Sequence, residues 1–452
     1  MVPRSSPPPS SRAAGFAVVT LGCPKNEADS DSLVRRLVAA GHRSAPVEHA
    51  EVVVVNTCGF IDAAKEESIG AILEACAAAH ARGARVAAVG CLVARYRADL
   101  VRELPEVDLW CGFEWDPLAR LLDETARERV DDSPPDRPRS RLVSAFVKVS
   151  DGCDGRCSFC AIPLIKGRYE VVPPAQVLAA ARAALSRGAR ELVLVGQDTS
   201  RYRVASWGGL ERLLTELAAL EPAPAWLRLL YLQPENVDES LLAALAAHAV
   251  PYLDVPFQHA SRRVLEAMGR RGDAEAHLAL LERARRALPG AAVRSTFIAG
   301  FPGETDADLD ELLAFVREAG LAVAGVFAFD PQEGTPAAAL PGRLPGDEVA
   351  ARAAAVSQAI ERAATPFWEA QVGNRVEVLV ERGCRAGGEA VGRVATQAPD
   401  VDGRTFLHGG RMRRGELVEA VLTQTLGFDL AAAAAPRASA GLTGAKTPAE
   451  GR

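Results

Sequence analysis

Apolar, β-branched stretches alternate with helix-length segments along most of this chain, and this alternation constrains its fold more than any other feature. The first series starts at Phe16, with expected strands FAVVTL, EVVVVN and RVAAVG and helices at 28–40 and 61–82. After the Pro-rich run DDSPPDRPRSR, a second series from LVSAFVKVS to LAVAGVFAFD contains six expected strands. Repeated strand–helix units form parallel sheets, so we expect an N-terminal parallel α/β domain followed by a whole or partial (β/α) barrel.

The pattern changes after an expected helix at 349–364. The segments NRVEVLVER, GEAVGRVAT, RTFLHGG and ELVEAVLTQT are short and separated by Gly, which predicts a small all-β module. The Pro-rich start and the Ala-rich end have no apolar period and are expected to be disordered. A chain of 452 residues is longer than a single hydrophobic core usually serves, so more than one domain is expected. The predicted divisions are a tail at 1–14, an N-terminal domain at 15–131, a linker at 132–140, a barrel at 141–364, the all-β module at 365–430 and a tail at 431–452.

The composition indicates a globular protein, with 48% hydrophobic and 24% charged residues. No apolar run is long enough to span a membrane, and no secretory signal is recognisable, so a cytoplasmic location is expected. In that reducing compartment the nine cysteines are not expected to form disulfides, and their spacing becomes the informative property. The net charge of -6 argues against a protein that clamps a nucleic-acid backbone over a broad surface.

Three cysteines fall within eight residues in the stretch DGCDGRCSFC. Cys153, Cys157 and Cys160 can direct their sulfurs to one point, and thiolates select zinc, copper(I) or iron–sulfur clusters. A closed zinc site needs a fourth ligand, but between 161 and 251 the only His or Cys is His248, in an Ala-rich helical stretch. Three thiolates on a four-iron cluster leave one iron open for a ligand. A zinc knuckle that only staples the loop is the alternative.

Three further cysteines each follow the end of an expected strand in the N-terminal domain. They are Cys23 in LGCPKNEADSD, Cys58 in VNTCGF and Cys91 in VGCL. The carboxyl ends of parallel strands meet at one edge of a sheet, so these thiols can converge into a second three-thiolate site. The alternative is that they are buried as small apolar groups. We expect the remaining cysteines to have packing roles and no role in a site; they are Cys76, Cys111 and Cys384.

The motif CDGRCSFC after a barrel strand resembles the radical S-adenosylmethionine superfamily. The resemblance implies that Cys153, Cys157 and Cys160 bind a 4Fe-4S cluster whose open iron chelates S-adenosylmethionine, and that Phe159 neighbours the adenine. From Phe16 to Leu430, the layout resembles the methylthiotransferases, which combine an N-terminal cluster domain, a radical barrel and a C-terminal TRAM module. This implies a second, auxiliary 4Fe-4S cluster, held by the thiolates of Cys23, Cys58 and Cys91.

Several stretches resemble the ribosomal-protein (RimO-like) branch of that family, among them ELVLVGQDTSRY, RLLYLQPENV, IAGFPGET and PQEGTPAAAL. This branch inserts a methylthio group at the β-carbon of an aspartate in the twelfth protein of the small ribosomal subunit. From 366 to 430 the chain has eight Arg and no Lys against nine Asp and Glu, which suits a basic protein better than RNA. RNA contact through the RMRR stretch, methylthiolation of adenosine in transfer RNA, and a non-enzymatic metal-stabilised interaction protein remain as alternatives.

Other candidate residues stand at expected strand ends. Gln197 and Asp198 end the second barrel strand, where they can contact cofactor or substrate, although Asp198 can equally accept hydrogen bonds in a turn. Gly300 in GFPGET allows close backbone approach to a ligand or forms a tight turn before Thr305 as an N-cap. His259 is expected to be structural, and no catalytic residue beyond the cluster ligands is identified. The resemblance further implies a low-potential electron donor such as a flavodoxin or ferredoxin, a sulfur donor, and no membrane partner.

Overall fold

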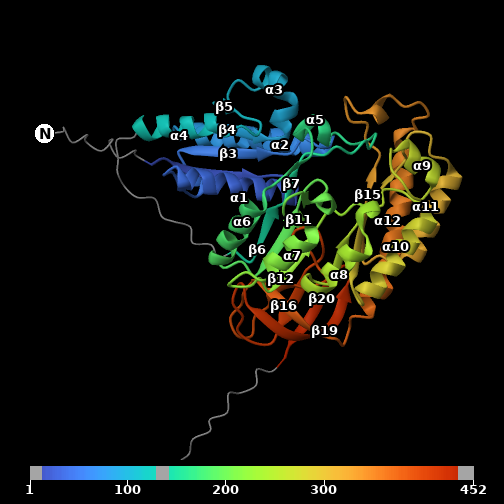
Figure 1. Ribbon diagram of the computed structural model, residues 1–452. Helices are drawn as coiled ribbons and strands as arrows, with labels where there is room; N and C mark the ends of the chain where they lie inside the picture. The colour runs from blue at the N-terminus through green and yellow to red at the C-terminus, as the bar shows by residue number, and fades with distance from the viewer. Residues whose placement is uncertain (1–12, 129–141, 436–452) are drawn as a thin grey trace, which may run out of the picture.

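The computed structural model describes residues 13–128 and 142–435 and shows three regions in chain order (Figure 1). An α/β domain stands above a larger, open barrel, and a small β-barrel lies below it. The linker and most of the two tails expected from the sequence lie outside the described residues. Ala14, which was expected in the N-terminal tail, is fully buried in the core of the α/β domain, because it immediately precedes the first strand.

The N-terminal domain is a five-stranded parallel sheet with strand order β2-β1-β3-β4-β5. Helices α1 (Pro24–Ala39) and α4 (Asp116–Glu128) pack on one face, and α2 (Asp62–His80) and α3 (Cys91–Glu103) pack on the other. A central strand covered on both faces should be largely apolar, and β3 begins with four valines and has all six residues buried. The strands are β1 (Gly15–Thr20), β2 (Arg43–Ser44), β3 (Val52–Thr57), β4 (Arg85–Gly90) and β5 (Leu109–Trp110).

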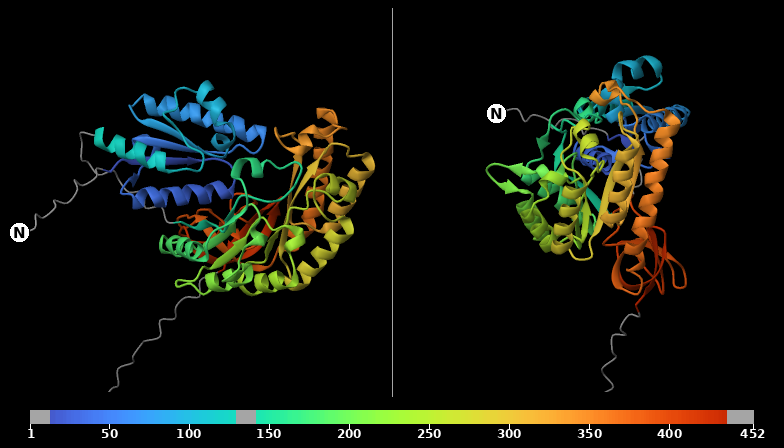
Figure 2. Two further views of the ribbon diagram at one scale, coloured as in Figure 1. Left: turned by 45° about the horizontal axis from the view of Figure 1, so that its top comes forward. Right: turned by 90° about the vertical axis from the view of Figure 1, so that its right-hand side faces the viewer.

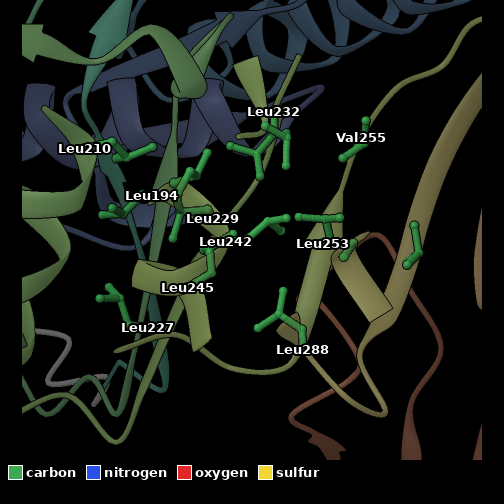
Figure 3. Packing of buried hydrophobic residues seen from close by; sticks show 14 of the residues in the cluster. Leu194, Leu210, Leu227, Leu229, Leu232, Leu242, Leu245, Leu253, Val255 and Leu288 are labelled. Atoms are coloured by element: carbon green, nitrogen blue, oxygen red, sulfur yellow. The ribbon is translucent and has the colours of Figure 1, made fainter. Parts of the chain in front are cut away.

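The central region contains the six expected strands, arranged as two three-stranded parallel sheets of order β6-β9-β12 and β13-β14-β15. Leu232 N–H donates to Asp254 O at 3.0 Å between the two sheets, and β15 is not joined back to β6, so the barrel is partial. The core between these strands and the helices outside them is packed with leucines from both, including Leu194, Leu229 and Leu253 (Figure 3). The strands are β6 (Ser144–Lys148), β9 (Glu191–Val195), β12 (Trp226–Leu229), β13 (Tyr252–Asp254), β14 (Ala292–Ala299) and β15 (Val323–Ala328).

Helices cover the outside of the barrel strands (Figure 2). Side-chain caps start three of them, with Asp238 accepting from Leu241 N–H, Asp273 from Ala276 N–H, and Thr305 forming a capping box. The helices are α5 (Ile162–Lys166), α6 (Pro174–Ser186), α7 (Leu210–Ala218), α8 (Glu239–His248), α9 (Arg262–Ala267), α10 (Ala274–Ala287), α11 (Asp306–Ala319) and α12 (Gly346–Glu369), and the cysteine loop is bordered by the short pair β7 (Ser150–Asp151) and β8 (Glu170–Val171).

The C-terminal module is a closed barrel of order β16-β17-β18-β20-β19. Its last strand corrects the expectation of a tail from residue 431, because 431–434 belong to β20. A run of alanines has no apolar alternation of its own, but pairing with both β18 and β19 closes the barrel and buries Leu430 and Ala432. The strands are β16 (Arg375–Arg382), β17 (Ala390–Val394), β18 (Thr405–His408), β19 (Leu417–Leu426) and β20 (Asp429–Ala434).

Buried charges dock the N-terminal domain onto the barrel beside the cysteine loop. Lys166 Nζ donates to Asp29 Oδ2 of α1 at 2.7 Å, and Lys148 forms an ion pair with the same carboxylate. Lys166 also lies 3.3 Å from Asp151, which begins the cysteine loop. The described helices include none that is both long and apolar enough to cross a lipid bilayer.

Candidate functional site

The loop after β7 carries Cys153, Cys157 and Cys160, all partly exposed. Gly155 N–H donates to Cys153 Sγ at 3.2 Å, and Arg270 Nη1 donates to Cys157 Sγ at 3.8 Å. Two of the three sulfurs on this loop therefore accept a hydrogen bond from a neighbouring N–H group.

The far side of this loop is anchored to the end of helix α9. Ser158 N–H donates to Met268 O at 2.9 Å, and Ser158 Oγ donates to Ala267 O at 2.8 Å. Gly269 has a φ of +70°, and a Cβ there would overlap the carbonyl of Arg156. The cysteine loop is thus held by backbone contacts from an element more than 100 residues away.

The N-terminal cysteines lie together at the carboxyl edge of the parallel sheet, as the sequence predicts. Cys23 is the N-cap of α1, Cys58 follows β3 directly, and Cys91 is the first residue of α3. All three line one cavity of about 490 Å³, which we call the cysteine cavity. Gly22 makes the close approach possible, since its φ is +87° and a Cβ there would lie 2.7 Å from Cys58 Cβ.

Asn26 ties the three strand ends together. Its side-chain amide donates to Leu21 O at 2.8 Å and to Thr57 O at 3.0 Å, and its oxygen accepts from Cys91 Sγ at 3.7 Å. Sequence reasoning missed this residue, because it stands in the polar string KNEADSD that begins an otherwise ordinary helix. Its burial, which only the fold reveals, is the signal that identifies it.

Barrel residues complete the wall of the cysteine cavity. Gln197, Tyr231, Arg294 and Thr296 face it from the barrel, and Val401 reaches it from the C-terminal module. The side-chain oxygen of Gln197 is buried without a hydrogen-bond partner, so it is available to a ligand. The N-terminal cysteines therefore open toward the barrel mouth, and the predicted contact residue Gln197 lies with them.

Lys25 links the two groups of cysteines electrostatically. Its ammonium lies 3.6 Å from the centre of the Tyr231 ring and interacts with the charges of both Cys23 and Cys160. Tyr231 has a φ of +65°, a strained value for an aromatic residue, and its N–H donates to Asp254 Oδ2 at 2.9 Å. Neither Lys25 nor Tyr231 was identified from the sequence, because a single Lys or Tyr has no distinguishing pattern.

Burial raises the pKa of the Cys91 and Cys160 thiols to about 12 each, and it also raises the pKa of Cys58 and Cys153. These thiols would release protons on binding a metal centre, which replaces the proton as the compensating positive charge. Over residues 13–128 and 142–435, no three His, Cys, Asp or Glu side chains converge tightly enough for a single metal ion. A four-iron cluster holds its thiolates farther apart than a single ion does, and thiolates are the donors that such a cluster takes.

Phe159 lies in a second cavity of about 220 Å³, which we call the Phe159 cavity. Gln258, Ile298 and Phe329 share this cavity with it, and Thr296 lies between it and the cysteine cavity. An aromatic ring in a mostly apolar hollow is suited to a planar ring such as adenine. The predicted neighbour of the adenine is therefore placed in a hollow next to the cysteine cavity.

Two other predicted contact residues make local bonds. Asp198 Oδ1 accepts from Ser200 Oγ at 2.6 Å. Asp198 is therefore a hydrogen-bond acceptor in a turn, which is one of the two roles that the sequence allowed for it. Gly300 has a φ of +77°, its N–H donates to Glu304 Oε2 at 2.9 Å, and a Cβ there would lie 2.7 Å from Val349 on α12. Gly300 thus serves a tight turn against a helix and lines neither cavity. His259 is fully buried, and its Nδ1 accepts from a nearby backbone N–H at 3.0 Å.

The remaining cysteines lie apart from these cavities. Cys76 packs between α2 and the sheet, and Cys111 packs on the opposite face of the same sheet. Cys384 lies in the C-terminal module, where its Sγ donates to Gly410 O at 3.4 Å. These positions agree with packing roles.

Family models match all three regions. The model described as the radical SAM superfamily matches residues 147–316, the one described as uncharacterized protein family UPF0004 matches 15–112, and the one described as the TRAM domain matches 372–434. A solved structure of the radical S-adenosylmethionine methyltransferase TsrM from Kitasatospora setae has a TM-score of 0.52 at 16% identity, covering 73% of this chain and 77% of that one. At that identity the likeness shows the shared fold.

Full-length relatives are much closer in sequence. The ribosomal protein uS12 methylthiotransferase RimO of Nocardioides sp. (strain ATCC BAA-499 / JS614) is 41% identical, over 95% of this chain and 99% of the relative. The protein of the same name from Anaeromyxobacter sp. (strain K) is also 41% identical, over 91% of each chain. Identity at this level extends over all three regions. The chain therefore belongs to the RimO family of radical S-adenosylmethionine methylthiotransferases.

Proposed function

We propose that this protein inserts a methylthio group at the β-carbon of an aspartate in ribosomal protein uS12. One observation carries the proposal: the cysteines at the edge of the N-terminal sheet open into a cavity whose opposite wall is the mouth of the radical barrel. One thiolate set that lines this cavity and a second set on a loop of the barrel fit a reaction in which one centre activates the substrate and the other delivers sulfur. The acidic C-terminal module and the family relatives named for uS12 support a protein substrate.

Six thiolates would hold the two clusters. Cys153, Cys157 and Cys160 would bind the cluster that carries S-adenosylmethionine, and the N-terminal set would bind the auxiliary cluster. When bound, these groups supply a carbon radical strong enough to remove hydrogen from an unactivated C–H bond, together with the sulfur and its methyl group. An ordinary side-chain base could not remove the β-hydrogen of an aspartate, so the chemistry requires such a cofactor.

The protein's own residues orient the reactants and exclude water. Phe159 provides an apolar face for the adenine ring, and the free oxygen of Gln197 can accept a hydrogen bond from a bound group. Arg270 and Lys25 place positive charge beside Cys157 and Cys23 respectively, which offsets the negative charge of thiolate-ligated clusters. The docking of Asp29 with Lys148 and Lys166 holds the N-terminal domain beside the cysteine loop of the barrel.

The proposed reaction also needs partners. A flavodoxin or ferredoxin would supply the low-potential electron, and a separate sulfur donor would restore the auxiliary centre. A ribosomal substrate places the proposed activity in the cytoplasm.

The test is an anaerobic reaction of reconstituted protein with S-adenosylmethionine, a reductant and either uS12 or transfer RNA, read by mass spectrometry. The expected result is a methylthio mass gain on one aspartate of uS12 and none on transfer RNA. Cys157→Ala should abolish formation of 5'-deoxyadenosine, whereas Cys58→Ala should retain it and lose methylthio transfer. Cys384→Ala is the matched control and should behave like the unaltered protein. A gain on transfer RNA alone would overturn the proposed substrate.

A further inference from the structure

Three hollows lie in a row through the molecule. The Phe159 cavity adjoins the cysteine cavity, and the two share Thr296 and Phe327 in their walls. On its other side the cysteine cavity adjoins a groove of about 740 Å³ between the barrel and the C-terminal TRAM barrel, which we call the TRAM groove. Arg294 and Val401 line both the cysteine cavity and the TRAM groove, so they form the partition between them.

Arg294 is held from two sides by buried carboxylates. Its Nη1 donates to Asp254 Oδ1 at 3.0 Å, and its Nε lies 3.5 Å from Asp402 Oδ1 in the TRAM barrel. The side chains of Asp254 and Asp402 are 2% and 0% exposed, whereas Arg294 is 18% exposed. Of these two contacts only the one from Nη1 is a hydrogen bond, because Arg294 Nε and Asp402 Oδ1 are both buried without a hydrogen-bond partner. The N–H groups of Nη2 remain for a ligand.

Asp402 is itself fixed by the barrel. Its Oδ2 accepts from the hydroxyl of Tyr252 at 2.7 Å and from Ala398 N–H at 2.8 Å. The TRAM loop that carries Asp402 thereby becomes part of the wall of the cysteine cavity. The orientation of Arg294 depends on this loop, because Asp254 alone would fix only one end of the guanidinium.

The charged side chains on the wall of the cysteine cavity are all basic. Among the described residues its charged lining consists of Lys25, Lys166 and Arg294, with no Asp or Glu. Lys166 is already engaged by Asp29 and Asp151. Lys25 stands over the Tyr231 ring next to the cysteines, so Arg294 is the basic residue on the side that faces the TRAM groove.

The TRAM groove has the opposite character. Its acidic residues are Glu361, Asp402 and Asp429, and Arg294 is its only basic one in the described structure. Leu426, Val401 and Phe428 add apolar surface. Such a groove suits a basic polypeptide segment, and the guanidinium of Arg294 lies at the inner end of the groove.

We infer that Arg294 determines specificity by binding the carboxylate of the substrate aspartate, which enters along the TRAM groove, with Asp402 as a positioning residue. The inference rests on the proposed function. A guanidinium recognises a carboxylate by paired hydrogen bonds, and this contact would hold the β-carbon at the cysteine cavity. The carboxylate of S-adenosylmethionine has the same chemistry, but Arg294 lies at the end of the row remote from Phe159.

The test compares Arg294→Gln and Arg294→Lys with the unaltered protein, using uS12 and a uS12 variant with asparagine at the modified position. The unaltered protein should prefer the aspartate form, and Arg294→Gln should raise the KM for uS12 by roughly 10- to 100-fold and remove that preference. Arg294→Lys, which keeps the charge, should retain the preference with a smaller rise in KM. Arg286→Gln, on the exposed surface of α10, is the matched control.

Three further measurements separate the outcomes. The KM for S-adenosylmethionine in 5'-deoxyadenosine formation without uS12 should not change, and a tenfold rise would overturn the inference in favour of the cofactor carboxylate. Asp402→Asn, which keeps the shape of the side chain, should raise the KM for uS12 while thermal unfolding stays within a few degrees. Direct binding of uS12 to the protein without clusters should weaken in parallel for Arg294→Gln.

Failure of the proposed function is distinguishable from failure of this inference. If the unaltered protein adds no methylthio group to uS12, the proposed function falls, and the role of Arg294 falls with it. If the unaltered protein modifies uS12 and Arg294→Gln keeps both the KM and the preference for aspartate, only the role of Arg294 is overturned.

Discussion

Arg393, on strand β17 of the TRAM barrel, donates a hydrogen bond to Glu191 at the start of β9, with Nη2 and Oε2 2.6 Å apart. Glu191 is fully buried, and its other oxygen accepts from Arg228 Nε at 2.8 Å. Ser144 Oγ adds a hydrogen bond of 2.7 Å. These contacts attach the TRAM barrel to the amino ends of barrel strands β6, β9 and β12. The attachment holds the loop that carries Asp402 in place.

Replacing Arg393 should therefore loosen the whole C-terminal module. Arg393→Met removes one of two cations from a buried carboxylate, and we expect the free energy of unfolding to fall by about 3 kcal/mol. Urea denaturation of the full chain, followed by tryptophan fluorescence, measures this change. Arg382→Met, at an exposed position of the same barrel, should change stability by no more than about 0.5 kcal/mol. Equal urea midpoints for the two variants would contradict the role of the buried network.

The stability of the protein should fall on mild acidification because of His277. Burial, together with the charge of Arg270, lowers the pKa of His277 to about 4 from an ordinary value of 6.5. Below pH 6.5 the unfolded chain binds a proton that the folded chain refuses until about pH 4, so stability decreases through this window.

His277→Leu should remove that component. Between pH 7 and pH 4.5 the unaltered protein should lose roughly 2 to 3 kcal/mol more than the variant. Urea midpoints at the two pH values give the comparison. His49→Leu is the control, because it removes an imidazole from an exposed position. A variant whose midpoint falls as steeply as that of the unaltered protein would show that His277 is not the source.

Asn26→Ala should affect the auxiliary centre selectively. The substitution removes the amide that joins the loops after β1 and β3 to Cys91, so the three N-terminal thiols lose their common support. We expect iron and sulfide per chain to fall to about half after reconstitution, as one of two clusters is lost. Formation of 5'-deoxyadenosine should persist. Asn374→Ala, at an exposed position in the C-terminal module, is the control. If Asn26→Ala lost 5'-deoxyadenosine formation as well as methylthio transfer, its effect would not be selective for the auxiliary centre.

Two glycines in the N-terminal domain allow the stability cost of backbone strain to be measured separately from the cost of a steric clash. Gly90 and Gly83 both have a positive φ, of +95° and +72°. A Cβ at Gly90 would overlap Asn56 Oδ1 and lie 2.9 Å from Thr57 O, whereas nothing lies within 4 Å of a Cβ at Gly83. Gly83→Ala should cost about 1 kcal/mol and Gly90→Ala about 3 kcal/mol, measured by thermal or urea unfolding. Similar costs at the two positions would show that the junction between β4 and α3 can relax.

Local patterns account for how much of the fold could be predicted. The alternation of β-branched runs with helical segments identified the principal strands of the N-terminal sheet and of the partial barrel, because strands buried on both faces are largely apolar. Strand β20 was missed, because its Ala-rich second half has no alternation and becomes a strand only through its neighbours β18 and β19. The shared cavity of Cys23, Cys58 and Cys91 could be predicted because parallel strands end at one edge.

The sequence by itself determined the chemistry of the protein: two sets of three thiols, an α/β framework that places them at strand ends, and membership of a recognisable family. Only the tertiary structure decided what surrounds them. Arg294 and Asp402 are 108 residues apart and Glu191 and Arg393 are 202 apart, yet the members of each pair are in contact. Such pairs leave no local signature, because the sequence around a single charged residue does not show which distant residue it will contact. A charged group that loses water on folding must be compensated by another group, and the tertiary structure determines which residue provides it.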